Sequence, residues 1–341
     1  MSKSTTTISQ WPPNLPAKLR LQLSLYAAIN KTDFGRKLLS VLAEARADAS
    51  PHHPIHGVTS SDVTVDPDRH LWFRLFLPPD LSPSTPLLIY FHGGGFQSYS
   101  PDNNFFDALC RNLAREIPAV IVSASYRLTP FFRYPCQYED GFDVLKFVDG
   151  PEFRSKYLKG SSGDLRKCFL AGDSAGGNIA HHVAVRASGH GSFKNLKLMG
   201  LIELMPFYGG EERTEAELRL KKALIIDAER TDKMWKTFLP EGADRDHGAA
   251  NVMGPNGVDL SEIEFPKTLV ICGGYDPLQD LDKRYCEWLD KCGKEVELKV
   301  YENAFHGFYC FQEVAETKMM IQDVKEFVHR TAAAAAGVDD A

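Results

Sequence analysis

The sequence predicts an α/β fold built on a mostly parallel central sheet, and three observations support this prediction. Short apolar runs that are typical of buried strands recur along the chain, and helical patterns lie between them. Two of these runs lead directly into glycine-rich turns, at 92–95 and at 172–176. Functional groups of such sheets lie beyond the carboxyl ends of the strands. The functional groups are therefore expected at these turns.

The second turn has the pattern Gly-x-Ser-x-Gly, with Ser174 at its centre, between a strand at 168–171 and a helical pattern. In this context the serine lies on a tight, strained turn and exposes its hydroxyl, as a nucleophile requires. Gly172 and Gly176 are expected to be glycines because a Cβ would collide where the helix turns back over the strand. Asp173 is expected to cap that helix.

The first turn follows a predicted strand at 86–91 and reads His-Gly-Gly-Gly. Backbone N–H groups in such a loop can turn towards an anion, and the N–H after a nucleophile points the same way. We therefore expect an oxyanion hole formed by Gly93, Gly94, Gly95 and Ala175.

Two later strands deliver the residues that a serine nucleophile needs as partners. Asp276 follows a strand at 267–274, and His306 follows an alternating strand at 295–301. The chain order Ser174, Asp276, His306 is the one expected for a nucleophile of this type. We predict His306 as the general base and Asp276 as the carboxylate that orients it.

Three other polar residues allow alternative interpretations. Asp280 is the nearest carboxylate that could replace Asp276. His247 could be mistaken for the base, but no predicted strand leads to it. Arg127 could contact a substrate, although we favour a structural ion pair or a backbone clamp.

The segments HGGGF, YRLxP, GDSAGGN, GGYDPLQD and FHGF resemble those of the hormone-sensitive-lipase-type branch of α/β-hydrolases, and particularly the plant carboxylesterases. The similarity extends from about 58 to 327. It implies an eight-stranded-type sheet flanked by helices, a helical cap and a serine carboxylesterase that acts through an acyl-enzyme. It also implies a small-molecule ester substrate and no cofactor.

Two alternatives to ester hydrolysis stay open. Plant gibberellin receptors share this fold and are expected to lack the catalytic histidine, so His306 favours an enzyme over a receptor-like ligand binder. Some relatives of plant carboxylesterases act as lyases, cyclases or dehydratases on specialised metabolites. Such a reaction would use the same pocket.

The domain organisation follows from patterning and from the resemblance. We predict a hydrolase domain over 58–330, interrupted at 211–264 by a cap insertion where charge density rises and strand patterning disappears. The resemblance implies that 1–57 form an N-terminal cap segment, the alternative being a peripheral helix without a role. A helix there would place Leu15, Leu19, Leu23 and Tyr26 on one face. Residues 331–341 are predicted to be a disordered tail.

The composition limits the classes of partner and the cellular location that are expected for this protein. The net charge of −6 argues against nucleic acid and anionic membranes. No signal peptide or membrane-spanning run is evident, so the cytoplasm is the expected location, with the nucleus left open. The seven cysteines are scattered, which predicts free thiols and no metal site. A monomer and a dimer fit equally well.

One stretch departs from the family. Relatives usually read like Tyr-Arg-Leu-Ala-Pro-Glu-His, whereas Phe131 and Phe132 occupy the last two positions in this chain. The two rings could pack beneath the loops near the oxyanion hole, or they could line the pocket and select an aromatic or terpenoid-like ligand. We favour packing support.

Overall fold

The structure is a computed structural model that describes residues 10–29, 45–158, 163–189, 191, 193–223 and 225–336. These residues form an eight-stranded sheet with the order β1-β2-β4-β3-β5-β6-β7-β8. The strands are β1 Thr59–Asp66, β2 Leu71–Leu77, β3 Leu87–Phe91, β4 Val120–Ala124, β5 Cys168–Asp173, β6 Leu198–Leu204, β7 Lys267–Tyr275 and β8 Val296–Phe305. Only β2 runs antiparallel to its neighbours β1 and β4, so the sheet is mostly parallel as predicted.

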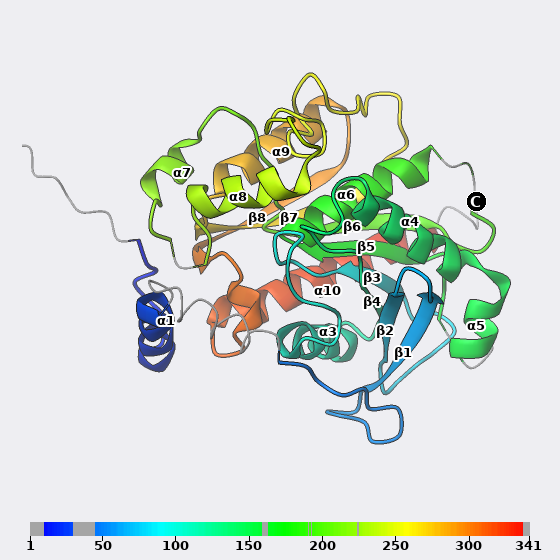
Figure 1. Ribbon diagram of the computed structural model, residues 1–341. Coiled ribbons are helices and arrows are strands. Elements are labelled where there is room, and N and C mark those ends of the chain that lie inside the picture. Colours follow the sequence, from blue (N-terminus) through cyan, green and yellow to red (C-terminus); the bar gives the residue numbers. More distant parts are fainter. Residues whose placement is uncertain are drawn as a thin grey trace, which may run out of the picture.

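Helices cover both faces of this sheet (Figure 1). Their bounds are α1 Ala17–Ile29, α3 Asn104–Glu116, α4 Cys136–Asp149, α5 Pro151–Tyr157, α6 Ala175–Ser188, α7 Glu215–Arg219, α8 Ala228–Phe238, α9 Gln279–Lys291 and α10 Ala315–Ala336. Residues of α4, α6, α8 and α9 belong to one buried apolar cluster, and those of α1, α3 and α10 to the other. The central strands are apolar on both faces because each face is covered by helices.

Strand register brings the predicted functional turns together. Phe91 at the end of β3 pairs with Gly172 in β5, so the glycine loop and the serine turn leave the sheet side by side. Tyr275 at the end of β7 pairs with Phe305 in β8, and Asp276 and His306 follow directly. All four segments therefore emerge at the carboxyl edge of neighbouring parallel strands, where ligands of such sheets bind.

The N-terminal prediction of a helix is confirmed over the part that the structure describes. Leu15, Leu19 and Leu23 are buried, whereas Leu21 and Leu25 are 71% and 59% exposed. Burial therefore follows the helical period and not the alternation of leucines. The side chain of Tyr26, and residues 1–9 and 30–44, lie outside the described part of the chain.

Two features differ from the sequence-based expectations. Helix α5 was not predicted; Pro151 at its start is a favourable first helical residue. Helix α10 continues to Ala336, so the tail predicted from 331 is wrong over its first six positions. The alanine run there extends the helix because alanine has the highest helix propensity. Residues 337–341 lie outside the described part.

No helix in the described ranges is both long enough and apolar enough to cross a lipid bilayer.

Candidate active site

Ser174 lies on a strained turn between β5 and α6, as its sequence context predicts. Its backbone has φ 50° and ψ −119°, a conformation that is costly for a residue with a side chain. The Ser174 N–H donates to the carbonyl of Leu204 at 2.9 Å, and its carbonyl accepts from the Phe207 N–H at 2.8 Å. The end of β6 therefore holds the strained backbone in place.

Close backbone contacts require both glycines of the turn, within the turn itself for Gly172, as predicted, and with the neighbouring strand β3 for Gly176. A Cβ on Gly176 would lie 1.9 Å from the carbonyl oxygen of Phe91, and one on Gly172 would lie 2.2 Å from that of Gly176. Both distances are shorter than any real contact, and both neighbours are backbone atoms that cannot move aside. Helix α6 consequently packs directly on the ends of β3 and β5.

The structure brings Ser174, His306 and Asp276 into one chain of hydrogen bonds. His306 Nε2 lies 3.0 Å from Ser174 Oγ, and His306 Nδ1 lies 2.8 Å from Asp276 Oδ2. Asp276 Oδ1 also accepts from the Leu278 N–H at 2.9 Å, which fixes the carboxylate. Because an ionised carboxylate can only accept, the proton of the neutral imidazole is on Nδ1 and the lone pair on Nε2 faces the serine. Asp276 is fully buried, and Ser174 and His306 are 7% and 6% exposed.

The glycine loop lies beside Ser174, but its three amides are not equivalent. The Gly93 N–H donates to Asp173 Oδ1 at 2.8 Å and is therefore occupied. Gly94 and Gly95 have φ 109° and 62°, which favours glycine at both positions. Within the described residues, neither of their amides donates to a protein acceptor. Ala175 is the first residue of α6, where an N–H has no acceptor inside the helix.

Asp173 does not cap α6, contrary to the sequence-based expectation. The N-cap residue is Ser174, without a side-chain hydrogen bond to the helix, and the Asp173 carboxylate points elsewhere. It accepts from the hydroxyls of Tyr90 at 2.7 Å and Tyr309 at 2.8 Å, and from Gly93. Burial raises the pKa of Asp173 to about 6, although all three donors act to lower it. No local signal could have revealed this, because each partner is distant in sequence.

Helix α8, in the segment between β6 and β7, packs against the glycine loop. The ring of Phe96, next to Gly95, stacks on Phe238 with 3.8 Å between centroids. A Cβ on Gly95 would lie 2.5 Å from Met234 Sδ, so this methionine contacts the loop directly. On the other side, the Thr129 N–H donates to the Phe96 carbonyl at 2.9 Å. Sequence reasoning missed Met234 and Phe238 because the segment lacks strand patterning and carries no motif.

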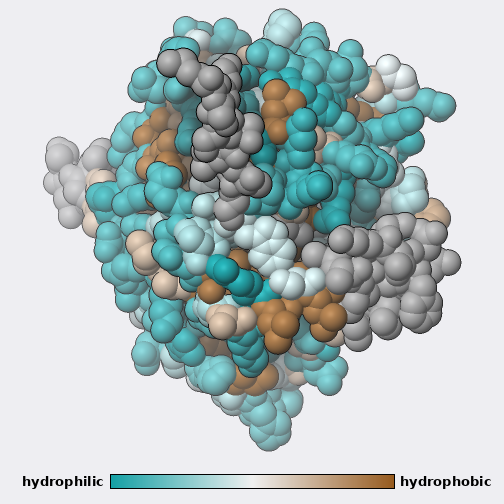
Figure 2. All heavy atoms as spheres, turned by 90° about the vertical axis from the view of Figure 1, so that its left-hand side faces the viewer, coloured by the Kyte–Doolittle hydropathy of each residue, from teal (hydrophilic) through white to brown (hydrophobic). Residues whose placement is uncertain are grey.

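The N-terminal segment also contacts this inserted segment. Gln10 Nε2 donates to the carbonyl of Arg219 at 2.9 Å, and Gln10 Oε1 accepts from the Lys222 N–H at 3.1 Å. Helices α1 and α7 thus lie on the same side of the molecule, where hydrophobic side chains form separate groups among hydrophilic ones (Figure 2). This contact supports the proposal that residues 1–57 and the insertion at 211–264 act together as a cap.

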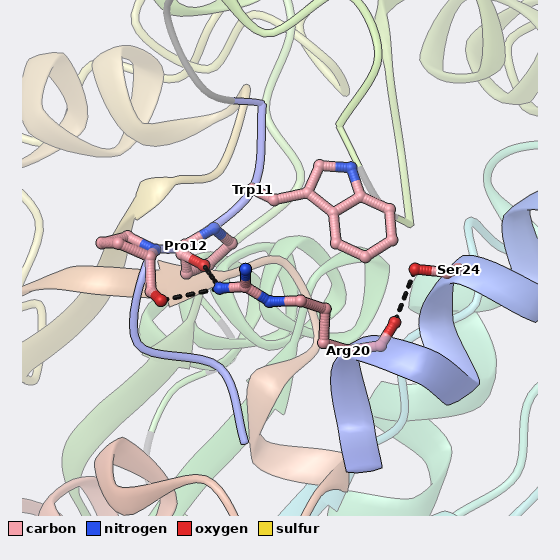
Figure 3. A pocket seen from close by; sticks show the side chains of 5 residues that line it. Trp11, Pro12, Arg20 and Ser24 are labelled. Atoms are coloured by element: carbon pink, nitrogen blue, oxygen red, sulfur yellow. Dashed lines mark hydrogen bonds between the residues drawn. The ribbon is translucent and has the colours of Figure 1, made fainter. Parts of the chain in front are cut away.

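A cavity of about 450 Å³ lies within the N-terminal segment itself (Figure 3). Its lining residues are Trp11, Pro12, Pro13, Arg20 and Ser24. The Arg20 guanidinium crosses it and donates to the carbonyls of Pro12 and Pro13 at 3.3 and 2.7 Å. The guanidinium thus joins helix α1 to the loop before it, and none of the lining residues belongs to the Ser174 site.

The residues that allowed alternative interpretations have other contacts. Arg127 forms an ion pair with Asp140 at 2.9 Å, which confirms the structural interpretation. His247 accepts from the Ala249 N–H at 3.1 Å, and its ring packs against Tyr134. Asp280 accepts from the Ala216 N–H at 2.8 Å, so this carboxylate anchors α7.

The hypothesis that Phe131 packs beneath the glycine loop is wrong. Phe131 is 88% exposed, which also argues against a role in lining a pocket. Phe132 is 45% exposed, and its ring lies 5.6 Å from the Arg127 guanidinium. The cis peptide bonds before Pro130 and Pro135 bracket this turn. Thr129, rather than either aromatic ring, supports the loop.

In the ranges that the structure describes, no three His, Cys, Asp or Glu side chains are grouped as metal ligands would be. The cysteines there are free thiols, as predicted.

Comparisons with known proteins agree with this geometry. The profile of a family described as alpha/beta hydrolase fold matches residues 88–310. A gibberellin receptor of Arabidopsis thaliana is 36% identical over 96% of this chain and 96% of its own length. Carboxylesterase 20 of the same plant is 35% identical over 83% of this chain and 88% of its own. The solved structure of a hyperthermophilic esterase from the archaeon Pyrobaculum calidifontis superimposes with a TM-score of 0.72 at 26% identity, covering 93% of this chain and 99% of that one. The mostly parallel sheet, the serine turn after β5 and the similarity to these proteins show that the chain belongs to the α/β-hydrolase family.

Proposed function

We propose that this protein is a serine carboxylesterase that hydrolyses carboxylic esters of small to medium-sized molecules. The observation that carries the proposal is the 3.0 Å contact between His306 Nε2 and Ser174 Oγ, with Asp276 on the far side of the imidazole. A serine hydroxyl is a weak nucleophile until an adjacent base takes its proton, and this arrangement supplies the base.

In this proposal the reaction has two halves. Ser174 Oγ attacks the ester carbonyl carbon while its proton moves to His306 Nε2. The resulting imidazolium is stabilised by Asp276, which keeps its own negative charge. His306 then returns the proton to the departing alcohol, leaving an acyl-enzyme, and water repeats the cycle to release the carboxylic acid. No cofactor takes part in these steps.

The tetrahedral intermediates carry a negative charge on the former carbonyl oxygen. We assign the N–H groups of Gly94, Gly95 and Ala175 to that oxygen, because the Gly93 N–H is bonded to Asp173. One such donor typically contributes about a hundred- to a thousand-fold in rate.

The test is turnover of p-nitrophenyl esters of increasing acyl length by wild type and by Ser174→Ala. Ser174→Ala should abolish turnover and leave the fold intact, because only a hydroxyl is lost. Ser188→Ala is the matched control, since Ser188 lies at the other end of α6 and donates to the carbonyls of Ala184 and Glu264. Retention of most of the esterase activity in Ser174→Ala would contradict the proposal.

Gibberellin binding is a second candidate, favoured by the receptor that matches over 96% of this chain. The two functions separate experimentally. Titration calorimetry of Ser174→Ala with a gibberellin should detect no saturable heat if the protein is an esterase only. Binding together with absent ester turnover in wild type would favour the receptor function.

Elimination or cyclisation would rely on the same base. Product analysis by mass spectrometry distinguishes it from hydrolysis, because hydrolysis in H₂¹⁸O places one heavy oxygen in the released acid. Turnover without this label would favour a lyase.

A further inference from the structure

The carboxylate of Asp173, directly before the nucleophile, is buried and accepts three hydrogen bonds. Its Oδ1 accepts from the Tyr90 hydroxyl at 2.7 Å and from the Gly93 N–H at 2.8 Å. Its Oδ2 accepts from the Tyr309 hydroxyl at 2.8 Å. Only 3% of Asp173 is exposed. It touches neither Ser174 Oγ nor His306 by a hydrogen bond, so the mechanism described above leaves it without a role.

These donors come from the segments that carry the reacting groups. Tyr90 is in β3, just before the glycine loop, and Gly93 is in the loop itself. Tyr309 follows His306 in a short 3-10 helix, Phe308–Cys310. Asp173 ends β5, which lies beside β3 in the sheet (Figure 1). One side chain therefore ties the backbone of the nucleophile to the oxyanion loop and to the segment of the base.

The position of the loop depends closely on this carboxylate. A Cβ at Gly93 would lie 2.3 Å from Asp173 Oδ2, so the loop backbone passes directly over the carboxylate. With the Gly93 N–H turned down onto Oδ1, the chain enters the left-handed conformations at Gly94 and Gly95. The ionised form suits this place because it offers acceptors only, and three donors point at it. An amide there would replace one of the two acceptor oxygens with an N–H donor, so at least one of the present donors would lose its acceptor.

We propose that Asp173 is a positioning residue, whose carboxylate fixes the amides of Gly94 and Gly95 relative to Ser174 and His306. This inference rests on the proposed esterase function. Oxyanion donors act because they are held in place before charge develops, so a small displacement weakens the transition state more than the bound ester. Loss of the Asp173 contacts should therefore lower kcat and leave KM nearly unchanged.

The test uses two variants that keep the shape of the site. Tyr309→Phe removes one donor to Asp173, and Asp173→Asn removes one acceptor atom. Tyr301→Phe is the matched control, because Tyr301 is also buried and its hydroxyl also donates to a carboxylate, Asp323, away from the site. We expect kcat to fall about ten-fold in Tyr309→Phe and about a hundred-fold in Asp173→Asn. Removing one oxyanion-hole donor outright typically costs about a hundred- to a thousand-fold, so these losses lie below or near that effect. The control should match wild type.

Two further readouts separate positioning from stability. Inhibition by a trifluoromethyl ketone, which forms a tetrahedral adduct with the serine, should weaken in parallel with kcat/KM. Hydrogen–deuterium exchange of peptides covering 92–98 should accelerate in both variants and not in Tyr301→Phe. If Asp173→Asn fails to fold, Tyr309→Phe alone decides.

The outcomes distinguish this inference from the proposed function. Absent turnover in wild type contradicts the esterase proposal, and the exchange measurement still decides whether Asp173 holds the loop. Normal wild-type turnover, with kcat and exchange unchanged in Tyr309→Phe and Asp173→Asn, overturns the positioning role. If hydrogen–deuterium exchange of the peptides covering 92–98 is the same in both variants as in wild type, the positioning role is overturned whatever the activity.

Discussion

The carboxyl edge of the sheet and the segment inserted between β6 and β7 are built by different interactions. At the edge, Ser174, Asp276 and His306 each follow a strand directly, and strand register sets their separation. The inserted segment has no strand in the described residues and is attached mainly through side chains, with Phe238 on Phe96 and Met234 on Gly95, and by single backbone contacts such as the Tyr134 N–H on the Phe238 carbonyl. Backbone pairing tolerates few alternatives, whereas side-chain packing can change residue by residue. If the protein is the esterase proposed above, we expect the edge to supply the reacting groups and the insertion to influence which substrate reaches them.

The largest effect is expected when one carboxyl group at the carboxyl edge of the sheet is replaced by an amide. Asp276→Asn should lower kcat on the order of ten-thousand-fold, because an amide favours the wrong imidazole tautomer. Asp280→Asn is the control, since Asp280 anchors α7 and lies outside the chain of hydrogen bonds. Steady-state kinetics with p-nitrophenyl acetate measures both. Similar losses in the two variants would mean that Asp280 shares the orienting role.

A substitution in the stacked pair of Phe96 and Phe238 tests how the insertion is attached to the glycine loop. Phe238→Ala removes a buried ring that stacks on Phe96 and should lower the free energy of unfolding by about 3 to 5 kcal/mol. It should also lower kcat, because Phe96 is adjacent to the glycine loop. Phe131→Ala, at an 88% exposed position, should change stability by no more than about 0.5 kcal/mol. Urea unfolding and kinetics check both, and an unchanged kcat in Phe238→Ala would separate the insertion from the chemistry.

Buried acids in the sheet should respond to pH in the opposite direction from solvated acids in the insertion. Burial raises the pKa of Glu203 in β6 from 4.5 to about 8, while the Tyr208 hydroxyl donates to it at 2.7 Å. The folded state therefore retains a proton that the unfolded chain has lost, and stability falls as pH rises from about 5 to 8. For this group the fall is roughly 1.4 kcal/mol per pH unit.

Glu203→Gln should remove that part of the decline, because an amide does not titrate and its oxygen still accepts from Tyr208. Asp246 in the insertion is the contrasting residue: hydrogen bonds from the Asn251 side-chain amide and the Glu211 backbone N–H lower its pKa, so its contribution to stability is lost as pH falls. Urea unfolding of wild type and Glu203→Gln at several pH values measures the slopes. Parallel slopes for wild type and Glu203→Gln would contradict a protonated Glu203.

The smallest expected effect concerns selectivity. Met234→Ala opens space beside Gly95 without altering the reacting groups, so kcat/KM for bulky acyl groups should rise relative to acetyl by about ten-fold. Met319→Ala, at a 53% exposed position in α10, is the control and should leave the ratio unchanged. A panel of p-nitrophenyl esters gives the ratio. An unchanged ratio in Met234→Ala would place the acyl pocket elsewhere.

The sequence by itself determined the features that depend on neighbours along the chain. Strand patterns and the two glycine turns predicted where Ser174, Asp276 and His306 leave the sheet, because alternation and steric crowding are local properties. Gly172 is a clear example, since a Cβ there would collide with the carbonyl oxygen of Gly176, four positions later in the same strand–turn–helix unit.

Only the tertiary structure decided which side chains meet across distant segments. Asp173 resembled a helix cap, yet its partners Tyr90 and Tyr309 are 83 and 136 positions away. Phe131 resembled a packing residue but is exposed, while Phe238 from the insertion supports the glycine loop. The physical reason is that such contacts depend on the register of separately formed strands and on the docking of whole helices. No short stretch of sequence encodes either.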